Sequence, residues 1–259
     1  DSTKTCYRYN GAGSCNITSP TITPASGFAT VGWNTSSSAT SSGLNTSTAK
    51  AFSANATYYA ITKSTSAISV TFNIGSTSTT TSTKTCYRYN GATSCTIQTP
   101  AVTTKSGYTQ NGWGTSSSST TASYNASTNY SFSAGTTLYA LQKKTITITF
   151  NKNTASSVSP TSRTCTMYNS STTCSVQMAT ITPRSGKTAV GWGTSASSTS
   201  SSYTPGTSYS FNASKTLYAI TKANTQTYTF NFKKTSSHSF YSYSGTTKTC
   251  TGSGSCSVT

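Results

Sequence analysis

Short runs in which apolar and polar residues alternate recur along this chain. In residues 144–151 the apolar residues Ile146, Ile148 and Phe150 are separated by threonines, and residues 68–74 show the same alternation. This is the period of a half-buried β-strand. No stretch shows convincing helical periodicity, so the pattern predicts an all-β or β-rich fold.

The pattern is repeated at a fixed interval. The tryptophans Trp33, Trp113 and Trp192 lie 80 and 79 residues apart, each within the same short sequence motif. Such a period marks a tandem array of small modules, and arrays of this kind act as spacers or extended binding surfaces. We expect one small core per module, built on repeated aromatic residues. These are Trp33, Trp113, Trp192, Tyr59, Tyr139, Tyr218, Phe72, Phe150 and Phe230.

The repeat predicts four segments. Residues 1–63 form a module without its opening strand (module 1), residues 64–143 (module 2) and 144–222 (module 3) form complete modules, and residues 223–259 begin a further one. Two interpretations follow. The chain is a window on a longer repetitive polypeptide, or the strand at residues 228–232 completes module 1 of a neighbouring subunit by donor-strand addition.

The cysteines are spaced for one covalent staple per module. The pairs are Cys6 and Cys15, Cys86 and Cys95, Cys165 and Cys174, and Cys250 and Cys256. Equal spacing and an even count favour disulfides within modules and an oxidising, extracytoplasmic setting. The dipeptides Asn10-Gly11 and Asn90-Gly91 are strong turn signals, so each disulfide is expected to cross a β-hairpin. Zinc binding is the competing reading, but such sites need two further Cys or His ligands per pair, and His238 is the single histidine.

An ordered set of motifs resembles the Listeria-Bacteroides (internalin B-type) repeats of bacterial surface proteins. In module 2 the order is Phe72-Asn73, Pro100, Gly107-Tyr108, Gly112-Trp113, Phe132-Ser133 and Leu138-Tyr139-Ala140. The resemblance implies a compact β-grasp-like module of about 80 residues, strung along secreted or cell-surface proteins as a stalk, spacer or adhesive array. This chain departs from the family in its added cysteine pairs and its lack of acidic residues.

The near absence of carboxylates excludes several activities. Asp1 is the single acidic residue. The chain therefore lacks the paired carboxylates of a glycosidase, an acidic calcium cage and a Ser-His-Asp triad. We interpret the chain as non-enzymatic, without cofactor or metal.

The formal net charge of +17 suggests a second role. A basic surface attracts anionic polymers or glycans with salt-sensitive affinity, although the positive residues are spread thinly. The triplets at residues 7–9 and 87–89 interleave Tyr and Arg as single-strand nucleic-acid binders do, but such triplets also serve packing, and we expect no specific nucleic-acid recognition. The Ser/Thr runs after each Gly-Trp are expected to be solvated loops, with O-linked glycan as an alternative.

The sequence thus predicts an extracellular or cell-surface structural protein, a fibre, stalk or filament of disulfide-stapled modules. Its expected partners are other copies of itself or adjacent modules of the same long chain. The alternative is an adhesin array that binds anionic cell-surface polymers or glycans. No signal peptide or membrane span is visible within these residues.

Overall fold

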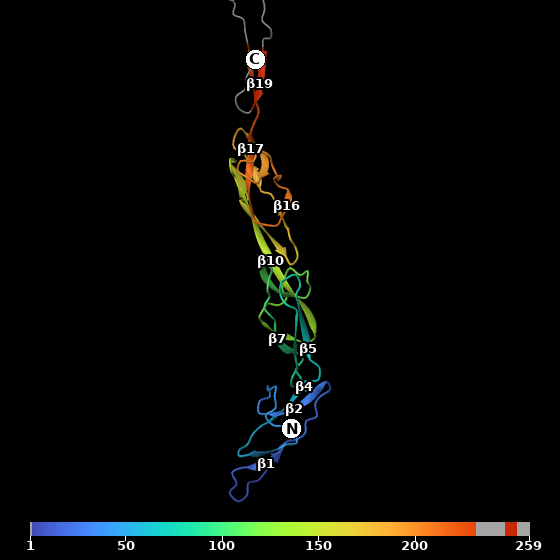
Figure 1. The fold of residues 1–259 in the computed structure, drawn as a ribbon. Coiled ribbons are helices and arrows are strands. Elements are labelled where there is room, and N and C mark those ends of the chain that lie inside the picture. Colours follow the sequence, from blue (N-terminus) through green and yellow to red (C-terminus); the bar gives the residue numbers. More distant parts are fainter. Residues whose placement is uncertain (1, 232–246, 253–259) are drawn as a thin grey trace, which may run out of the picture. The chain divides into compact units, whose positions relative to one another are not determined.

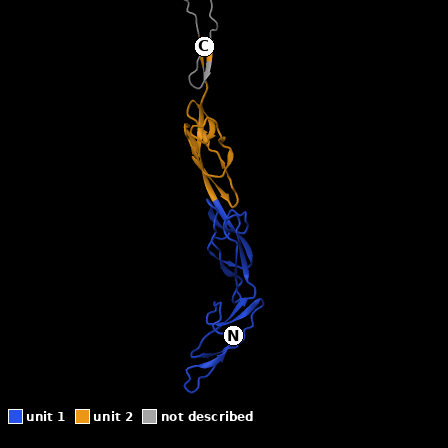
Figure 2. Ribbon diagram, viewed as in Figure 1, with its two compact units in different colours: residues 1–143 blue, residues 144–259 orange. Residues whose placement is uncertain are grey.

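The computed structural model describes residues 2–231 and 247–252, which divide into two compact units, residues 1–143 and 144–259 (Figure 2). Every regular element in these residues is a β-strand (Figure 1). The predicted all-β class is therefore confirmed. The division into four modules stays a prediction, and we keep the module names for the residue ranges given above.

The strands of the first unit are short. They are β1 (Cys15–Thr18), β2 (Phe28–Asn34), β3 (Ala49–Phe52), β4 (Tyr59–Ser64), β5 (Ile68–Asn73), β6 (Ser82–Cys86), β7 (Cys95–Gln98), β8 (Thr109–Gly114), β9 (Asn129–Phe132) and the first part of β10 (Thr136–Asn151).

The second unit begins with the rest of β10. Its other strands are β11 (Ser157–Ser159), β12 (Ser162–Tyr168), β13 (Cys174–Gln177), β14 (Thr180–Thr182), β15 (Lys187–Gly193), β16 (Ser208–Phe211), β17 (Lys215–Ala223), β18 (Gln226–Asn231) and β19 (Thr247–Gly252).

Module 2 is built from two small sheets. In the larger one the opening strand β5 lies between β6 and the closing strand β10, and β8 pairs with the other edge of β10. The pairing of β5 with β10 is parallel, Val70 opposite Thr136, whereas the pairs β5–β6 and β8–β10 are antiparallel. The smaller sheet is the antiparallel pair β7–β9. Both sheets contribute side chains to one core.

That core is made by the inward positions of the alternating strands. Its buried members are Ile68, Val70, Phe72, Ile97, Trp113, Phe132, Leu138 and Ala140. The ring of Phe72 meets Trp113 edge-on with centroids 4.9 Å apart, a favoured aromatic geometry. The Trp113 indole donates a hydrogen bond to the Pro100 carbonyl at 2.9 Å, which satisfies its one polar group in the interior.

The glycine before each tryptophan is required for steric reasons. Gly112 has φ of +81°, and a Cβ at this position would lie 2.6 Å from the Tyr124 carbonyl oxygen and 2.8 Å from the Ala122 Cβ. Both the backbone conformation and the close approach therefore require glycine.

Replacing Gly112 by Ala is expected to destabilise module 2 by about 2 kcal/mol, because the substitution adds a clash to left-handed backbone strain. The matched control is Gly91→Ala, which has φ of +78° but nothing within 4 Å of the added Cβ. Chemical denaturation of both variants should give the larger loss for Gly112→Ala. Equal losses would show that the clash is relieved by small shifts.

Module 3 repeats this plan. Its opening strand is the last part of β10, which pairs in parallel with β17, and β12 and β15 occupy the two outer positions. A second sheet, β13–β16, covers the core, and Phe150 lies against Trp192 with ring centroids 4.8 Å apart. The core residues are Ile146, Ile148, Phe150, Ala155, Met167, Val176, Met178, Ala179, Trp192, Phe211, Leu217 and Ala219.

Module 1 contains only the pairs β2–β4 and β1–β3. Trp33 is half-buried, whereas Trp113 and Trp192 are fully buried, and Ala60 is exposed although its counterparts Ala140 and Ala219 are buried. Among residues 2–63 the buried hydrophobic side chains are Leu44 and Ile61. Among the described strands, none lies beside this core in the place that the opening strand has in modules 2 and 3.

The tyrosines of the Tyr-Ala strands and Phe230, expected in the core, are not among its buried residues. The tyrosine of each Tyr-Ala strand faces away from the core, because alternation along the strand turns its neighbours Leu138 and Ala140 inward; Tyr59 is 45% exposed. Phe230, expected in a core, is 46% exposed, because β18 pairs with β19 alone among the described strands.

The Ser/Thr runs after Gly-Trp form exposed turns, as expected. In each turn two serine hydroxyls lie within hydrogen-bond distance, 3.0 Å between Ser36 and Ser38 and 2.9 Å between Ser116 and Ser118. A backbone N–H also donates to the first hydroxyl. The hydroxyls therefore satisfy local donors and acceptors, which explains how so polar a chain forms ordered turns.

Candidate functional site

The described residues contain no carboxylate side chain and no histidine, and they hold no group of three or more His, Cys, Asp or Glu that could bind a metal ion. Hydrogen bonds from the side chain and then from the backbone of Thr204 lower the pKa of the Tyr209 hydroxyl. The features that could carry function are therefore the disulfides and the surfaces around them.

Three disulfides are present, one in each of the first three modules. They are Cys6–Cys15, Cys86–Cys95 and Cys165–Cys174. The fourth pair includes Cys256, which lies outside the described residues. Since these six cysteines are bonded to each other, they are not available as zinc ligands.

The expected β-hairpin across each disulfide is wrong. Cys86 ends β6, which pairs with β5, whereas Cys95 begins β7, which pairs with β9. The Asn-Gly turn does form, with φ of +52° at Asn90 and +78° at Gly91, but the flanking strands belong to different sheets. In modules 2 and 3 the disulfide therefore joins the two sheets, whereas in module 1 Cys6 lies outside any strand. We call the residues between paired cysteines the cysteine loop.

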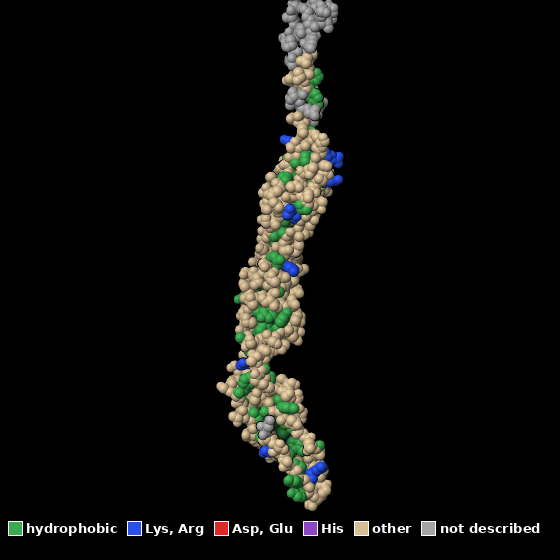
Figure 3. Space-filling view, turned by 180° about the vertical axis from the view of Figure 1, so that it is seen from behind, with side chains coloured by type: hydrophobic (Ala, Val, Ile, Leu, Met, Phe, Trp, Pro, Cys, Tyr) green, Lys and Arg blue, Asp and Glu red, His purple; other side chains and the backbone are tan. Residues whose placement is uncertain are grey.

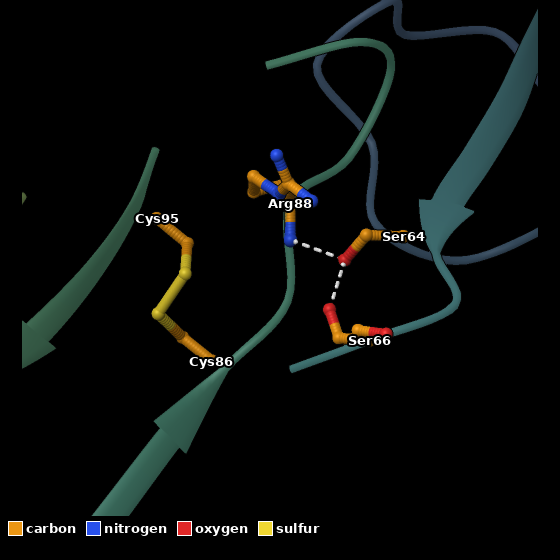
Figure 4. Close-up of a disulfide and its surroundings, with 5 residues drawn as sticks. All are labelled: Ser64, Ser66, Cys86, Arg88 and Cys95. Carbon is orange, nitrogen blue, oxygen red and sulfur yellow. Dashed lines mark hydrogen bonds between the residues drawn. A yellow bond between two sulfur atoms is a disulfide. The ribbon is translucent and has the colours of Figure 1, made fainter. Parts of the chain in front are cut away.

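The cysteine loop of module 2 reaches back to β4, which closes module 1 and ends at Ser64, the first residue of module 2. The Arg88 N–H donates to the Ser64 hydroxyl at 3.1 Å, and that hydroxyl donates to the Ser66 carbonyl at 2.8 Å (Figure 4). The Ser64 N–H donates to the Arg88 carbonyl at 2.8 Å. Through these bonds the backbone at Arg88 pairs with the edge of β4 over a short distance, as a neighbouring strand would.

Asn90 makes the second part of the same contact. Its N–H donates to the Thr62 carbonyl at 3.0 Å, and its Oδ1 accepts from the Thr62 N–H at 3.0 Å. Its Nδ2 donates to the Ser37 carbonyl at 2.9 Å and to the Ala39 carbonyl at 3.2 Å. One side chain thus links the closing strand and the Gly-Trp turn of the preceding module.

Cation–π contacts complete this joint. The Lys63 ammonium lies 3.6 Å from the centroid of the Tyr87 ring, and the Arg88 guanidinium lies 5.8 Å from that of Phe28. Such contacts stabilise by about 0.5 to 2 kcal/mol depending on burial. We call Tyr87–Asn90 the loop tip and Thr62–Ser64 the acceptor edge.

The first cysteine loop carries the same tip without this contact. Residues 2–12 and 82–92 are identical, yet Tyr7 and Tyr9 are 74% and 72% exposed, whereas Tyr87 is 38% exposed and Tyr89 half-buried. The same tip is therefore more covered where it contacts an acceptor edge.

The loop tip was not among the predicted site residues. Its Tyr-Arg-Tyr triplet was noted for nucleic-acid binding and for packing, and the structure shows packing against module 1. The exact repetition of eleven residues is the signal that could have identified it, because a local turn alone does not require Tyr-Arg-Tyr.

Asn90→Ala is expected to weaken the joint by about 1 to 2 kcal/mol, because it removes the hydrogen bonds of the side chain. Amide hydrogen exchange should accelerate at Thr62 and Ser64 while the core amides of module 2 keep their protection. Asn10→Ala, the same substitution in the same turn of the exposed loop, should leave exchange at Thr62 unchanged. A rate at Thr62 that is equal in Asn90→Ala and the parent protein would contradict this role.

The basic side chains do not form a patch on the face seen in Figure 3, where Lys and Arg stand apart from one another. Since the described residues contain no carboxylate side chain, none of these cations is neutralised by Asp or Glu. On this face the positive charge is therefore dispersed.

The repeat plan agrees with a known family. The sequence model of the Listeria-Bacteroides repeat domain matches the chain twice, over residues 69–141 and 147–220. The chain belongs to this family, as two tandem copies in a variant with cysteine pairs. No curated protein and no solved structure matches it.

Repeats of this family are typical of bacterial surface proteins, and disulfides fit an oxidising environment. Within the part of the chain that the structure describes, no helix has the length and apolarity to span a bilayer.

Proposed function

We propose that this protein is a non-enzymatic structural protein that forms an extracellular fibre, stalk or surface filament. The observation that carries the proposal is the joint between modules 1 and 2, in which the disulfide-closed loop of one module binds the acceptor edge of the module before it. A repeat that couples to its neighbour through a stapled loop is suited to transmit force along an array.

The sheet order supports a β-grasp-like module, as the resemblance implied. In module 2 the order β6-β5-β10-β8, with the opening and closing strands parallel at the centre, is the arrangement of a β-grasp sheet, here without a helix among the described residues. The parallel central pair means that tension between the two ends of a module acts along neighbouring strands. We propose that the disulfide between the two sheets resists their separation under such load.

Localisation and redox state in the native cell test this function. Immunogold electron microscopy with an antibody against the full chain should label the cell surface or filaments, and alkylation of intact cells should trap no free thiols on the protein. Cytoplasmic labelling together with alkylated cysteines would overturn the proposal.

The alternative function is an adhesin array for anionic or glycan surfaces. It is favoured by the exposed Tyr7 and Tyr9 and by the net charge of +17, with 18 Lys and Arg against one acidic residue. Retention of the full chain on an anionic-polymer column that is lost at high salt would support it. Passage through the column at low salt would exclude binding to anionic surfaces.

A further inference from the structure

An open hollow of about 710 Å³ lies on module 3, where β10 ends and β12 begins. Thr147 and Thr149 of β10 line it, and alternation along the strand places both on the outward face of the sheet, away from the core. The segment 152–161 connects β10 to β12 and supplies the rest of the wall. This segment contains β11, which is held by antiparallel pairing with β14. Three strands of one module therefore shape the hollow.

The lining is rich in hydroxyl groups that the protein does not use. Four of them belong to Thr147, Thr149, Ser157 and Ser162. Within the part of the chain that the structure describes, these four hydroxyls have no hydrogen-bond partner. The serines of the Gly-Trp turns differ, since their hydroxyls lie within hydrogen-bond distance of each other. Hydroxyls without a protein partner can donate to and accept from a ligand that carries many hydroxyl groups itself.

Asn151 adds an amide in a fixed orientation. Its Oδ1 accepts a hydrogen bond from the Asn153 N–H at 2.8 Å, and the Asn153 Nδ2 donates in turn to the carbonyls of Ala196 at 2.9 Å and Ala219 at 3.2 Å. These bonds hold the turn and leave the Asn151 Nδ2 as a donor without a partner among the described residues. A donor that is already ordered loses little conformational entropy when a ligand binds.

Lys152 gives the hollow a positive charge. Its side chain is exposed, and the described residues contain no carboxylate side chain that could neutralise it. The hollow also has the size of a small-molecule site, for which volumes of about 300 to 1,000 Å³ are usual. A ligand that carries acidic groups among many hydroxyls matches this combination of charge, size and lining.

We propose that the hollow binds an acidic glycan, a sugar chain with anionic substituents. The Asn151 amide and the lining hydroxyls form hydrogen bonds with the sugar hydroxyls, and the Lys152 ammonium pairs with an anionic group of the ligand. This inference rests on the alternative function, the adhesin array, and it names the class of ligand and the module that recognises it.

Module 2 provides a matched comparison. Asn73 occupies the place of Asn151 and forms the same turn, in which its Oδ1 accepts from the Gly75 N–H at 3.0 Å. Ile74 stands where module 3 has Lys152, and the connection to the next strand is shorter, residues 74–81 against residues 152–161. A substitution of either asparagine by Asp changes the net charge equally, but only the change at Asn151 alters the hollow.

Binding is tested by isothermal titration of the oxidised full chain with fragments of polygalacturonate and of dextran sulfate. Dextran serves as the neutral glycan and polyglutamate as the polyanion without sugar. We expect at least one acidic glycan to bind more tightly than dextran and polyglutamate, and the preference between the two identifies the anionic group. Asn151→Asp keeps the Oδ1 acceptor of the turn but removes the Nδ2 donor. It should weaken this binding at least about tenfold, whereas Asn73→Asp should change it less than about twofold.

Lys152→Gln is the second test, because an exposed side chain can be replaced without loss of the fold. It should weaken binding of the acidic glycan about fivefold or more at low salt. Lys105→Gln removes an exposed lysine of module 2 and should have a smaller effect.

The outcomes separate this site from the function on which it rests. Equal losses for the two asparagine variants, or for the two lysine variants, would mean that binding follows net charge. So would polyglutamate binding as tight as that of the acidic glycans. Either result would overturn the hollow as the site and leave the adhesin function in place. Absence of binding to every polymer would overturn the site together with adhesion to anionic polymers, and it would leave the proposed fibre untouched.

Discussion

Replacing Trp113 by Ala is expected to unfold module 2 locally, with a loss of about 3 to 5 kcal/mol. The indole is fully buried, meets Phe72 edge-on and donates to the Pro100 carbonyl, so the substitution leaves a cavity and removes that hydrogen bond. A module of this size has a total stability of roughly 4 to 12 kcal/mol, so this loss is a large part of it. Because the chain has several modules, the measurement should be limited proteolysis with mass mapping, which should find new cleavage within residues 64–143.

The matched variant is Trp33→Ala, which makes the same change in a module without its opening strand. Trp33 is half-buried and keeps its bond to the Pro20 carbonyl, but it has no counterpart of Phe72, so we expect less than half the loss. Equal losses at Trp33 and Trp113 would mean that the opening strand contributes little to the core around the tryptophan.

The parts of this fold that depend on short-range pattern could be predicted from the sequence. Alternation identified the opening strands, the period identified the repeat, and the Asn-Gly dipeptide identified the turn in the cysteine loop. Each of these features is decided by residues that lie close together in the chain.

The parts that failed depend on distant partners. The sequence around the Asn90-Gly91 turn suggests a hairpin, but β6 pairs with β5 and β7 with β9, because each finds an apolar neighbour elsewhere in the module. Tyr139 was assigned to the core because it is aromatic. Side chains alternate along a strand, however, and here Leu138 and Ala140 are the residues that point inward.

Residues 2–6 and 82–86 give the clearest case of tertiary control. The two pentapeptides are identical, but only the second forms a strand, because β5 is beside it. The intrinsic β-propensity of the residues cannot distinguish the two pentapeptides, since β-structure reflects pairing and burial more than the intrinsic preference of a residue. The docked and exposed loop tips differ for the same reason.

Removing the disulfide of module 2 by the double substitution Cys86→Ser/Cys95→Ser is expected to cost about 3 kcal/mol, the loop-closure contribution for a loop of this length. The two cysteines also pack against the core, and they hold together sheets that share no backbone ladder, so the variant should lose part of that packing as well. Urea denaturation followed by hydrogen exchange, with probes on β6 and β7, should show these two strands losing protection first.

The disulfide of module 1 provides the comparison, because its cysteines have the same separation in sequence, nine residues. Loop closure alone therefore predicts equal losses for Cys6→Ser/Cys15→Ser and for the module 2 variant. We expect a larger loss in module 2, since only there does the bond join two sheets around a closed core. A loss under about 1 kcal/mol in module 2 would contradict the assignment of the disulfide as its main staple.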